Sequence, residues 1–249
     1  MPRRRGFVAV VSNLRAGGSF YLLAALLLMF VLIPFLRSST LGGLLPESRG
    51  VVGTVILHLA VDAILITAAV TVAHARQPWQ MAALLVVVPA TIEALTWTAL
   101  DVPVSLLAFG RIYTGVGLLF VVYKGLVAMF GRRTVTADTI CLSLCAYVLL
   151  GLAWFYLYRA ILLIEPGSFG NLDRAADRGD NADDLFYYSY VTLTTLGFGD
   201  ITPKTSVARS LTIVEAIVGQ MFVAVVLARL VGMHIVAATT GQIRGGDAD

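Results

Sequence analysis

The sequence predicts an all-α integral membrane protein in which each subunit has six transmembrane helices and one short re-entrant helix. The first observation is composition: 58% of the 249 residues are hydrophobic and 13% are charged, and the mean hydropathy is +0.86. These values exclude a soluble domain. The second is a series of apolar runs long enough to cross the roughly 30 Å hydrocarbon core of a membrane. The third is a glycine-rich motif that follows a segment too short to span.

Six apolar runs define the predicted transmembrane helices, at residues 19–36, 51–73, 79–100, 104–130, 136–164 and 205–236. Pro103 marks the start of the fourth, because a proline disfavours helix at the residue before it. Residues 1–18 form a basic lead, and further basic clusters lie at 74–76 and 132–133. Basic loops collect on the cytoplasmic side of a membrane. We therefore expect both termini in the cytoplasm and the protein in the plasma (cell inner) membrane.

Residues 194–200 read Thr-Thr-Leu-Gly-Phe-Gly-Asp, and the chain is organised around them. A ring of backbone carbonyl oxygens can replace the water shell of an ion, which requires an extended backbone whose oxygens point inward. Gly197 and Gly199, at alternate positions, permit the φ values that such a backbone needs. We expect the side chains of Leu196 and Phe198 to point away from the ions and to pack behind the motif.

This motif resembles the selectivity filter of the tetrameric potassium channels, which reads Thr-Val-Gly-Tyr-Gly in that family. The resemblance is to the bacterial type with six transmembrane helices and one pore loop per subunit, and it implies a homotetramer around a central pore in membrane lipid. Leu196 and Phe198 replace the valine and the tyrosine, which removes a hydroxyl that would hydrogen-bond behind the filter. The resemblance also implies an ion-binding filter of five residues: Thr195, Leu196, Gly197, Phe198 and Gly199. K⁺, a permeant ion and not a cofactor, would be held by the carbonyls of the first four and by the Thr195 hydroxyl.

A short helix is expected to lead into the motif. Asp183 and Asp184 are placed to cap a helix that begins near Leu185, because carboxylates accept hydrogen bonds from the free N–H groups there. This helix would end at about Thr194, so it must enter the membrane and return, which is tolerated only for backbone that is buried in protein or lines a water-filled cavity. The likeness to the family implies that four residues support the filter: Tyr187, Tyr188, Thr194 and Asp200. One of the two tyrosines is expected to hydrogen-bond Asp200.

The resemblance divides the chain into four parts. Residues 1–18 are the cytoplasmic lead, and residues 19–135 form a four-helix module in the position of a voltage sensor. Residues 136–236 form the pore domain, with its outer helix, pore helix, filter and inner helix. Residues 237–249 form a short cytoplasmic tail.

The four-helix module lacks the basic repeat of a voltage sensor. From Arg111, steps of three residues reach no basic side chain, and Lys124 is the other basic residue of that helix. Each charge moved through 100 mV is worth about 2.3 kcal/mol, so several charges are needed, and we expect no steep voltage dependence. The intramembrane acids Asp62 and Glu93 either pair with Arg111 or His58 to hold the helices together or form a proton- or ligand-sensing site.

The last predicted helix carries the candidate gating and cavity residues. Gly219 lies twenty residues after Gly199, where channels of the family place a flexible glycine. It allows either a bend or a close contact with the pore helix. Glu215, one turn earlier, is expected to be buried near the pore helix, where it either hydrogen-bonds or lends a negative potential that favours cations. Three residues that follow at helical spacing are expected to face the central cavity: Gln220, Val223 and Leu227.

The chain is therefore expected to conduct K⁺ passively and to catalyse no reaction. The sequence contains no nucleophile–base pair, metal-ligand cluster or phosphate-binding loop, and neither a cofactor nor a nucleic-acid partner is expected. One alternative is a weakly selective cation channel, if Leu196 and Phe198 loosen the filter. Another is a subunit of a potassium uptake transporter, although such proteins usually carry several non-identical loops with a single glycine each.

Overall fold

The computed structural model describes residues 19–20, 22–28, 88, 91, 102–131, 136–172 and 181–246, and the surroundings of side chains as far as residue 232. The described residues of the first and third predicted spans are helical, and the second predicted span lies wholly outside the described residues. The remainder of those spans, with Asp62 and Glu93, lies outside the described residues, as do the lead at 1–18 and part of the acidic segment at 173–180.

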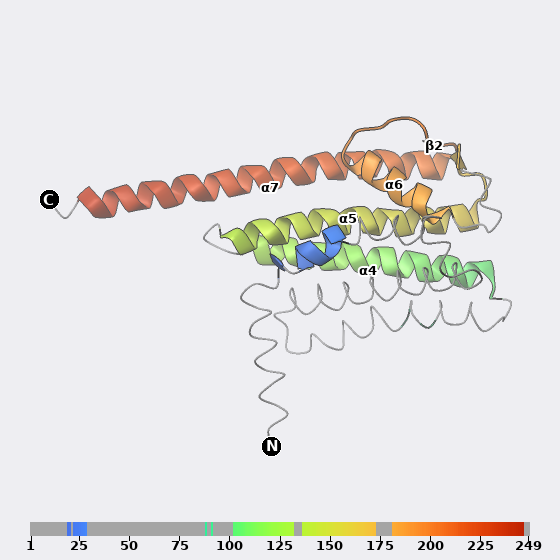
Figure 1. Cartoon of the computed structure of the whole chain (residues 1–249), viewed down its shortest axis with the longest axis horizontal. Coiled ribbons are helices and arrows are strands. Elements are labelled where there is room, and N and C mark those ends of the chain that lie inside the picture. Colours follow the sequence, from blue (N-terminus) through green and yellow to red (C-terminus); the bar gives the residue numbers. More distant parts are fainter. Residues whose placement is uncertain are drawn as a thin grey trace, which may run out of the picture.

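Within the described residues, three helices are long and apolar enough to cross a membrane, where the sequence predicts six over the whole chain. They are α4 (Val104–Phe130), α5 (Ala137–Ile164) and the part of α7 (Ser206–Gly246) that ends at Gly232. The fourth and fifth predicted spans agree with α4 and α5 to within one residue. The remaining helix, α6 (Ala182–Leu193), has 12 residues and is about 18 Å long. It is too short to span and lies beside α5 and α7 (Figure 1).

Local signals account for the ends of α4 and α5. α4 begins directly after Pro103, whose backbone is extended, and ends at Phe130, with Gly131 at the C-cap position. α5 begins after Thr136, whose hydroxyl oxygen accepts a hydrogen bond from the N–H of Thr139 at 3.3 Å. Proline before the first turn and threonine at the cap are ordinary start signals for a helix.

The start of α6 differs from the prediction by three residues. The helix begins at Ala182, with Asn181 at the cap position and no hydrogen bond from its side chain. Asp183 and Asp184 therefore lie in the first turn and do not cap it. Carboxylates in the first turn still face the positive end of the helix dipole, so the same residue types are favourable at either position.

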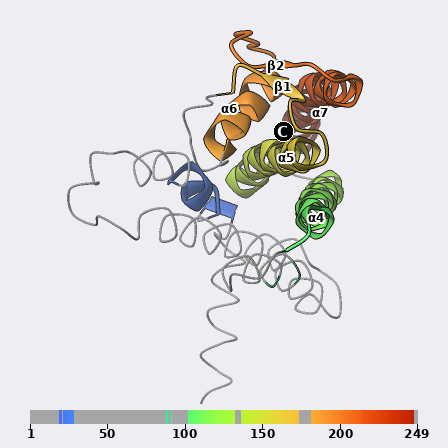
Figure 2. The same cartoon turned by 90° about the vertical axis from the view of Figure 1, so that its right-hand side faces the viewer.

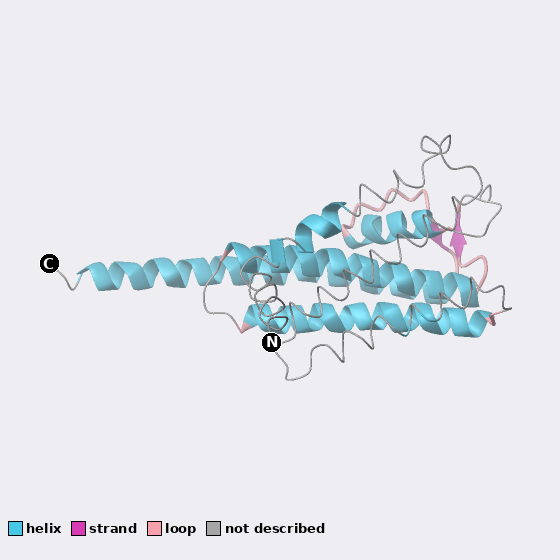
Figure 3. Cartoon of the chain, turned by 60° about the horizontal axis from the view of Figure 1, so that its bottom comes forward, coloured by secondary structure: helices cyan, strands magenta, loops and turns pink. Residues whose placement is uncertain are grey.

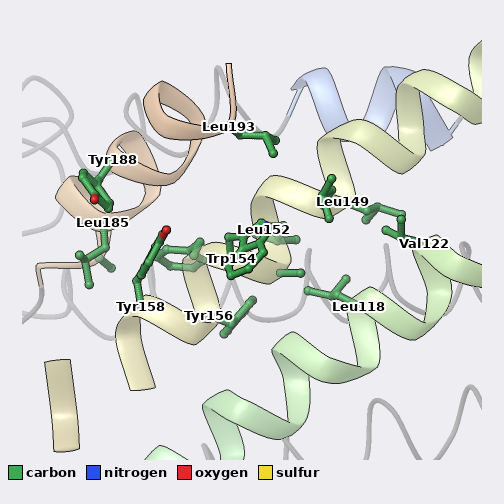
Figure 4. Close-up of a cluster of buried hydrophobic side chains, with 14 of the residues drawn as sticks. Leu118, Val122, Leu149, Leu152, Trp154, Tyr156, Tyr158, Leu185, Tyr188 and Leu193 are labelled. Atoms are coloured by element: carbon green, nitrogen blue, oxygen red, sulfur yellow. The ribbon is translucent and has the colours of Figure 1, made fainter. Parts of the chain in front are cut away.

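α4 and α5 pack closely along their length because small residues line the contact. A Cβ atom at Gly115 would lie 3.0 Å from the side chain of Leu157 and 3.1 Å from the carbonyl of Ala153. Small residues let membrane helices approach one another in this way. The buried core continues from α4 through α5 to α6 (Figure 4), where its labelled members are Leu118, Val122, Leu149, Leu152, Trp154, Tyr156, Tyr158, Leu185, Tyr188 and Leu193.

The helix α7 is longer than the sequence predicts. It continues to Gly246 and runs well past the ends of α4 and α5 (Figure 1), whereas the predicted helix ends at residue 236. Residues 237–244 contain no proline and include alanine, glutamine, isoleucine and arginine, which favour helix. The stretch also includes Gly241, which disfavours helix by about 1 kcal/mol relative to alanine, but α7 continues through it.

A two-stranded pairing that the sequence did not predict closes one end of the bundle. β1 (Phe169–Gly170) pairs antiparallel with β2 (Thr202–Pro203), with Phe169 opposite Pro203, and the N–H of Lys204 donates to the carbonyl of Ser168 at 2.8 Å. Figures 2 and 3 show this pair beside the ends of α5, α6 and α7. It ties the segment after α5 to the segment that follows the glycine-rich motif.

Candidate functional site

The backbone of the motif changes hand at every residue from Thr195 to Gly199, which means that the sign of φ alternates. The angle φ is +59° at Thr195, +56° at Gly197 and +76° at Gly199, whereas Leu196 and Phe198 have no positive φ. Glycine adopts positive φ readily. At the β-branched Thr195 a positive φ is a genuine outlier, and strained residues of this kind cluster at functional sites. The sequence had given no sign of it.

The inner end of the motif is hydrogen-bonded to the last turn of α6. The N–H groups of Leu196 and Gly197 both donate to the carbonyl of Val191, at 2.9 and 3.2 Å. The N–H of Thr195 donates to the carbonyl of Thr192 at 2.9 Å. The end of α6 and the start of the motif are therefore one hydrogen-bonded unit, and the position of α6 sets the position of the motif.

Asp200 fixes the outer end of the motif. Its carboxylate accepts hydrogen bonds from the N–H of Ile201, at 3.0 Å, and from Tyr187, and its backbone carbonyl accepts one from Nδ2 of Asn171 at 2.9 Å. The hydrogen bond from Tyr187 is the main reason that the pKa of Asp200 lies below its ordinary value. The ring of Tyr187 also stacks on that of Phe198, with centroids 6.4 Å apart and an interplanar angle of 5°. Tyr187 thus contacts two residues of the motif.

The other two predicted supporting residues make contacts of a different kind. Tyr188 is buried, and its hydroxyl lies 2.6 Å from the hydroxyl of Thr212, so it joins α6 to α7. Thr194 is exposed in the single chain, and its hydroxyl donates to the carbonyl of Tyr190 at 2.7 Å. Thr194 therefore closes the last turn of α6.

Two tyrosine hydroxyls connect α6 to α5. The hydroxyl of Tyr190 donates to the carbonyl of Val148 at 2.6 Å. In the opposite direction, the hydroxyl of Tyr147 on α5 donates to the carbonyl of Leu193, the last residue of α6, at 3.2 Å. These bonds fix the helix that carries the motif against a transmembrane helix.

Gly219 and Glu215 both lie where α7 meets α6. A Cβ atom at Gly219 would overlap the carbonyl oxygen of Leu193 and lie 3.0 Å from its Cδ1 atom, so this glycine makes a close contact with α6. Glu215 is fully buried, and its carboxyl group is hydrogen-bonded to Tyr158 on α5 and to Ser189 on α6.

The three candidate cavity residues, Gln220, Val223 and Leu227, are exposed on α7 in the single chain. So are the residues of the motif from Thr195 to Gly199. The single chain therefore leaves both sets of residues accessible.

The described contacts of α4 involve few basic residues. Nζ of Lys124 lies over the ring of Phe120, 5.4 Å from its centroid. At the C-terminal end of the same helix, Arg229 of α7 donates to the carbonyl of Phe130 at 3.0 Å. This bond satisfies one of the carbonyl groups that the end of a helix leaves without a partner, and it joins α4 to α7.

Substitution of Tyr187 by phenylalanine is expected to raise the pKa of Asp200 toward its ordinary value of 3.8. A carboxylate whose pKa is lowered in the folded state contributes stability above its ordinary pKa and loses that contribution as the pH falls through the lowered value. Without the Tyr187 hydroxyl this contribution shrinks, and the protonation midpoint of Asp200 lies at a less acidic pH. The measurement is an NMR titration of the Asp200 carboxyl carbon in the reconstituted protein.

Tyr123→Phe is the control for this titration, because Tyr123 is exposed on α4. This substitution should leave the Asp200 midpoint where it is in the unsubstituted protein. An unchanged midpoint in Tyr187→Phe would show that the hydroxyl does not act on Asp200.

Sequence reasoning missed Asn171 and Tyr147, which bond to the motif and to α6. It also missed Ser189, which lies on α6 and bonds to α5 and α7. For Asn171 a signal existed, because Gly-Asn is a turn-forming pair and asparagine tolerates positive φ, here +62°. For the two hydroxyl groups no signal existed, since their partners come from other helices.

The family match lies in the second half of the chain. Residues 142–235, from within α5 to within α7, match the family described as ion channel. A stretch of 60 residues is 44% identical to the "Two-pore potassium channel 4" of Arabidopsis thaliana. That stretch covers 24% of this chain and 21% of the relative, so the chain spans about a fifth of that protein. No solved structure matches the chain significantly. The protein is therefore an all-α integral membrane protein that contains an ion channel domain, and it is not an enzyme.

Proposed function

We propose that the protein is a potassium-selective channel in which four copies of the chain surround a central pore and K⁺ moves passively down its gradient. The observation that carries this proposal is the alternating hand of the backbone from Thr195 to Gly199, at the C-terminal end of the short helix α6. That helix lies between two helices of membrane length, α5 and α7.

The alternating hand matters because it sets the direction of the carbonyl groups. In a strand of uniform hand, successive carbonyls point to opposite sides. When positive and negative φ alternate, successive carbonyls turn to the same side and form a row of oxygen atoms. A row of this kind can replace the hydration shell of K⁺. We assign the ion sites to the carbonyls of Thr195, Leu196, Gly197 and Phe198, with the Thr195 hydroxyl, and Gly199 ends the filter.

Four chains are needed because one row of carbonyls cannot surround an ion. The surface of α7 supports assembly, since most of its apolar side chains are exposed in the single chain. Those most exposed are Val207, Ile213, Val214, Ile217, Met221, Val223, Val225, Leu227 and Val231. Several of these, with the exposed Leu196 and Phe198, would be covered by neighbouring subunits.

Potassium is favoured as the ion by two facts. The Arabidopsis relative, 44% identical over 60 residues, is a two-pore potassium channel by name. The motif also contains two glycines, both with positive φ, whereas the loop of a potassium uptake transporter would be expected to contain a single glycine. With Arg111 and Lys124 as the two basic residues of α4, we propose opening that depends little on voltage. We also propose the cell inner membrane as location and the cytoplasm as the side of both termini.

The test is a planar bilayer that contains the purified protein, with potassium on one side and sodium on the other. We expect the current to reverse near the potassium equilibrium potential and the open probability to change little with voltage. A reversal near zero would favour the weakly selective cation channel. A steeply voltage-dependent current would contradict the proposal for residues 19–135.

A further inference from the structure

Glu215 stands apart from the other polar residues of α7 because it is fully buried in the membrane-spanning part of the helix. Its side chain has no exposed surface, and no other acidic or basic residue in the described part of the chain is buried to that extent. It lies four residues before Gly219, on the side of α7 that contacts α5 and α6. A carboxyl group in this position must be stabilised by specific partners.

Three short distances between oxygen atoms connect this carboxyl group to α5 and α6. Oη of Tyr158 lies 2.5 Å from Oε2 of Glu215. Oγ of Ser189 lies 2.7 Å from Oε1 of Glu215 and 2.8 Å from the carbonyl oxygen of Gly151. Each is the distance of a hydrogen bond between two oxygen atoms, so each contact requires one hydrogen atom.

The number of hydrogen atoms decides the charge of the carboxyl group. The carbonyl of Gly151 can only accept, so the single hydroxyl hydrogen of Ser189 lies on that side. An ionised Glu215 is also only an acceptor, and its contact with Ser189 would then have no hydrogen at all. Two oxygen atoms with facing lone pairs would lie 2.7 Å apart. A protonated Glu215 supplies the missing hydrogen, and all three contacts are satisfied.

The surroundings of Glu215 agree with a neutral group. In the part of the chain that the structure describes, the titratable residues that face it are four tyrosines, Tyr147 and Tyr158 on α5 and Tyr188 and Tyr190 on α6. Its hydrogen-bond partners in the described part of the chain are hydroxyl groups, with no lysine or arginine among them. Without a compensating positive charge, a buried carboxylate in a membrane is very costly.

The nearest charged residue on α7 itself is too far along the helix to change this conclusion. Arg209 lies six residues before Glu215, which is about 9 Å along the axis. It is exposed, and its Nε donates to the carbonyl of Pro203.

We infer that Glu215 is a neutral carboxylic acid and a positioning residue for the helix that carries the motif. Tyr158 donates to Glu215, Glu215 donates to Ser189, and Ser189 donates to the backbone of Gly151. This directed chain of hydrogen bonds joins α5, α7 and α6 and returns to α5. Ser189 lies one turn before the end of α6, so the chain sets the depth of the motif in the membrane. That last step rests on the proposed channel function, whereas the protonation state does not.

The protonation state is tested by infrared spectroscopy of the full-length protein in lipid at neutral pH. The difference between the unsubstituted protein and Glu215→Gln should contain the C=O stretching band of a protonated carboxylic acid. Glu165→Gln is the matched control, since Glu165 is exposed at the end of α5, and its difference spectrum should lack that band. Carboxylate bands in place of the acid band in the Glu215→Gln difference would overturn the inference.

The positioning role is tested by K⁺ currents. Glutamine has an N–H to donate to Ser189 and an oxygen to accept from Tyr158, so Glu215→Gln should keep currents within about twofold of those of the unsubstituted channel. Alanine can do neither, and Glu215→Ala should lower the current per protein by about tenfold or more. This is the ratio that corresponds to the free energy of one buried hydrogen bond. If Glu215 acted through a negative charge, glutamine and alanine would lower the current alike, which would overturn the inference.

A pH series separates this role from a passive packing role. Ionisation of Glu215 in alkaline solution removes the hydrogen atom from its contact with Ser189, so currents of the unsubstituted channel should fall as the pH rises, while those of Glu215→Gln stay level. Equal pH profiles would contradict the positioning role. If none of the proteins is selective for K⁺, the proposed function fails, and the infrared result still decides the protonation state.

Discussion

Substitution of Gly197 by alanine is expected to abolish the discrimination between K⁺ and Na⁺ while the protein remains assembled in the membrane. At φ = +56° an L-residue costs about 1–2 kcal/mol more than glycine, and in a tetramer four such residues meet at one level of the pore. The backbone can relieve this cost by turning the peptide, which takes a carbonyl oxygen away from the ion. A Cβ atom at Gly197 would meet no atom within 4 Å, so the expected defect comes from backbone hand and not from a clash.

Gly167→Ala is the matched control for this prediction. Gly167 also has a positive φ, +91°, and open space around the added Cβ atom, but it lies in the exposed turn between α5 and β1. Its substitution therefore carries a comparable backbone cost outside the motif and should leave selectivity unchanged. The measurements are the reversal potential in mixed K⁺ and Na⁺ and the amount of tetramer after purification. Normal selectivity in Gly197→Ala and in the equivalent Gly199→Ala would contradict a carbonyl filter.

The helices α4 and α5 could be predicted from the sequence because their signals are local. Pro103 and Thr136 mark the starts of α4 and α5, and the apolar runs give their lengths. The motif itself could be located because glycines at alternate positions allow two positive φ angles with one residue between them. The positive φ at both was therefore expected, and it is what the structure has.

The contacts that hold the motif could not be predicted to the same degree, because their partners are distant in the sequence. Neighbouring residues on a helix point about 100° apart, so the sequence cannot say which of Tyr187 and Tyr188 faces the motif. The structure places Tyr187 against Phe198 and Tyr188 against Thr212. The pairing of β1 with β2 was missed for a related reason, since two-residue strands have no periodicity to detect.

Substitution of Gly219 by alanine is expected to displace α6 and so to disturb the motif. The added Cβ atom would overlap the carbonyl oxygen of Leu193, which is a backbone atom and cannot rotate away. That carbonyl also accepts the hydrogen bond from Tyr147 at 3.2 Å, which resists its movement. Overpacking of this kind typically costs about 1–3 kcal/mol. We expect less stable tetramers and a loss of K⁺ selectivity, because Thr195 follows Leu193 by two residues.

Gly232→Ala is the control on the same helix, because a Cβ atom there would meet no atom within 4 Å. Alanine favours helix over glycine by about 1 kcal/mol, so this substitution should stabilise the protein slightly, and the two variants should differ in sign. Thermal dissociation of the purified tetramer measures the change in stability, and the reversal potential measures the change in K⁺ selectivity. A glycine kept only as a bend in the inner helix would give a different result: Gly219→Ala would change the open probability and leave stability and selectivity unaltered. The pair of variants therefore decides between a hinge and a close contact at Gly219.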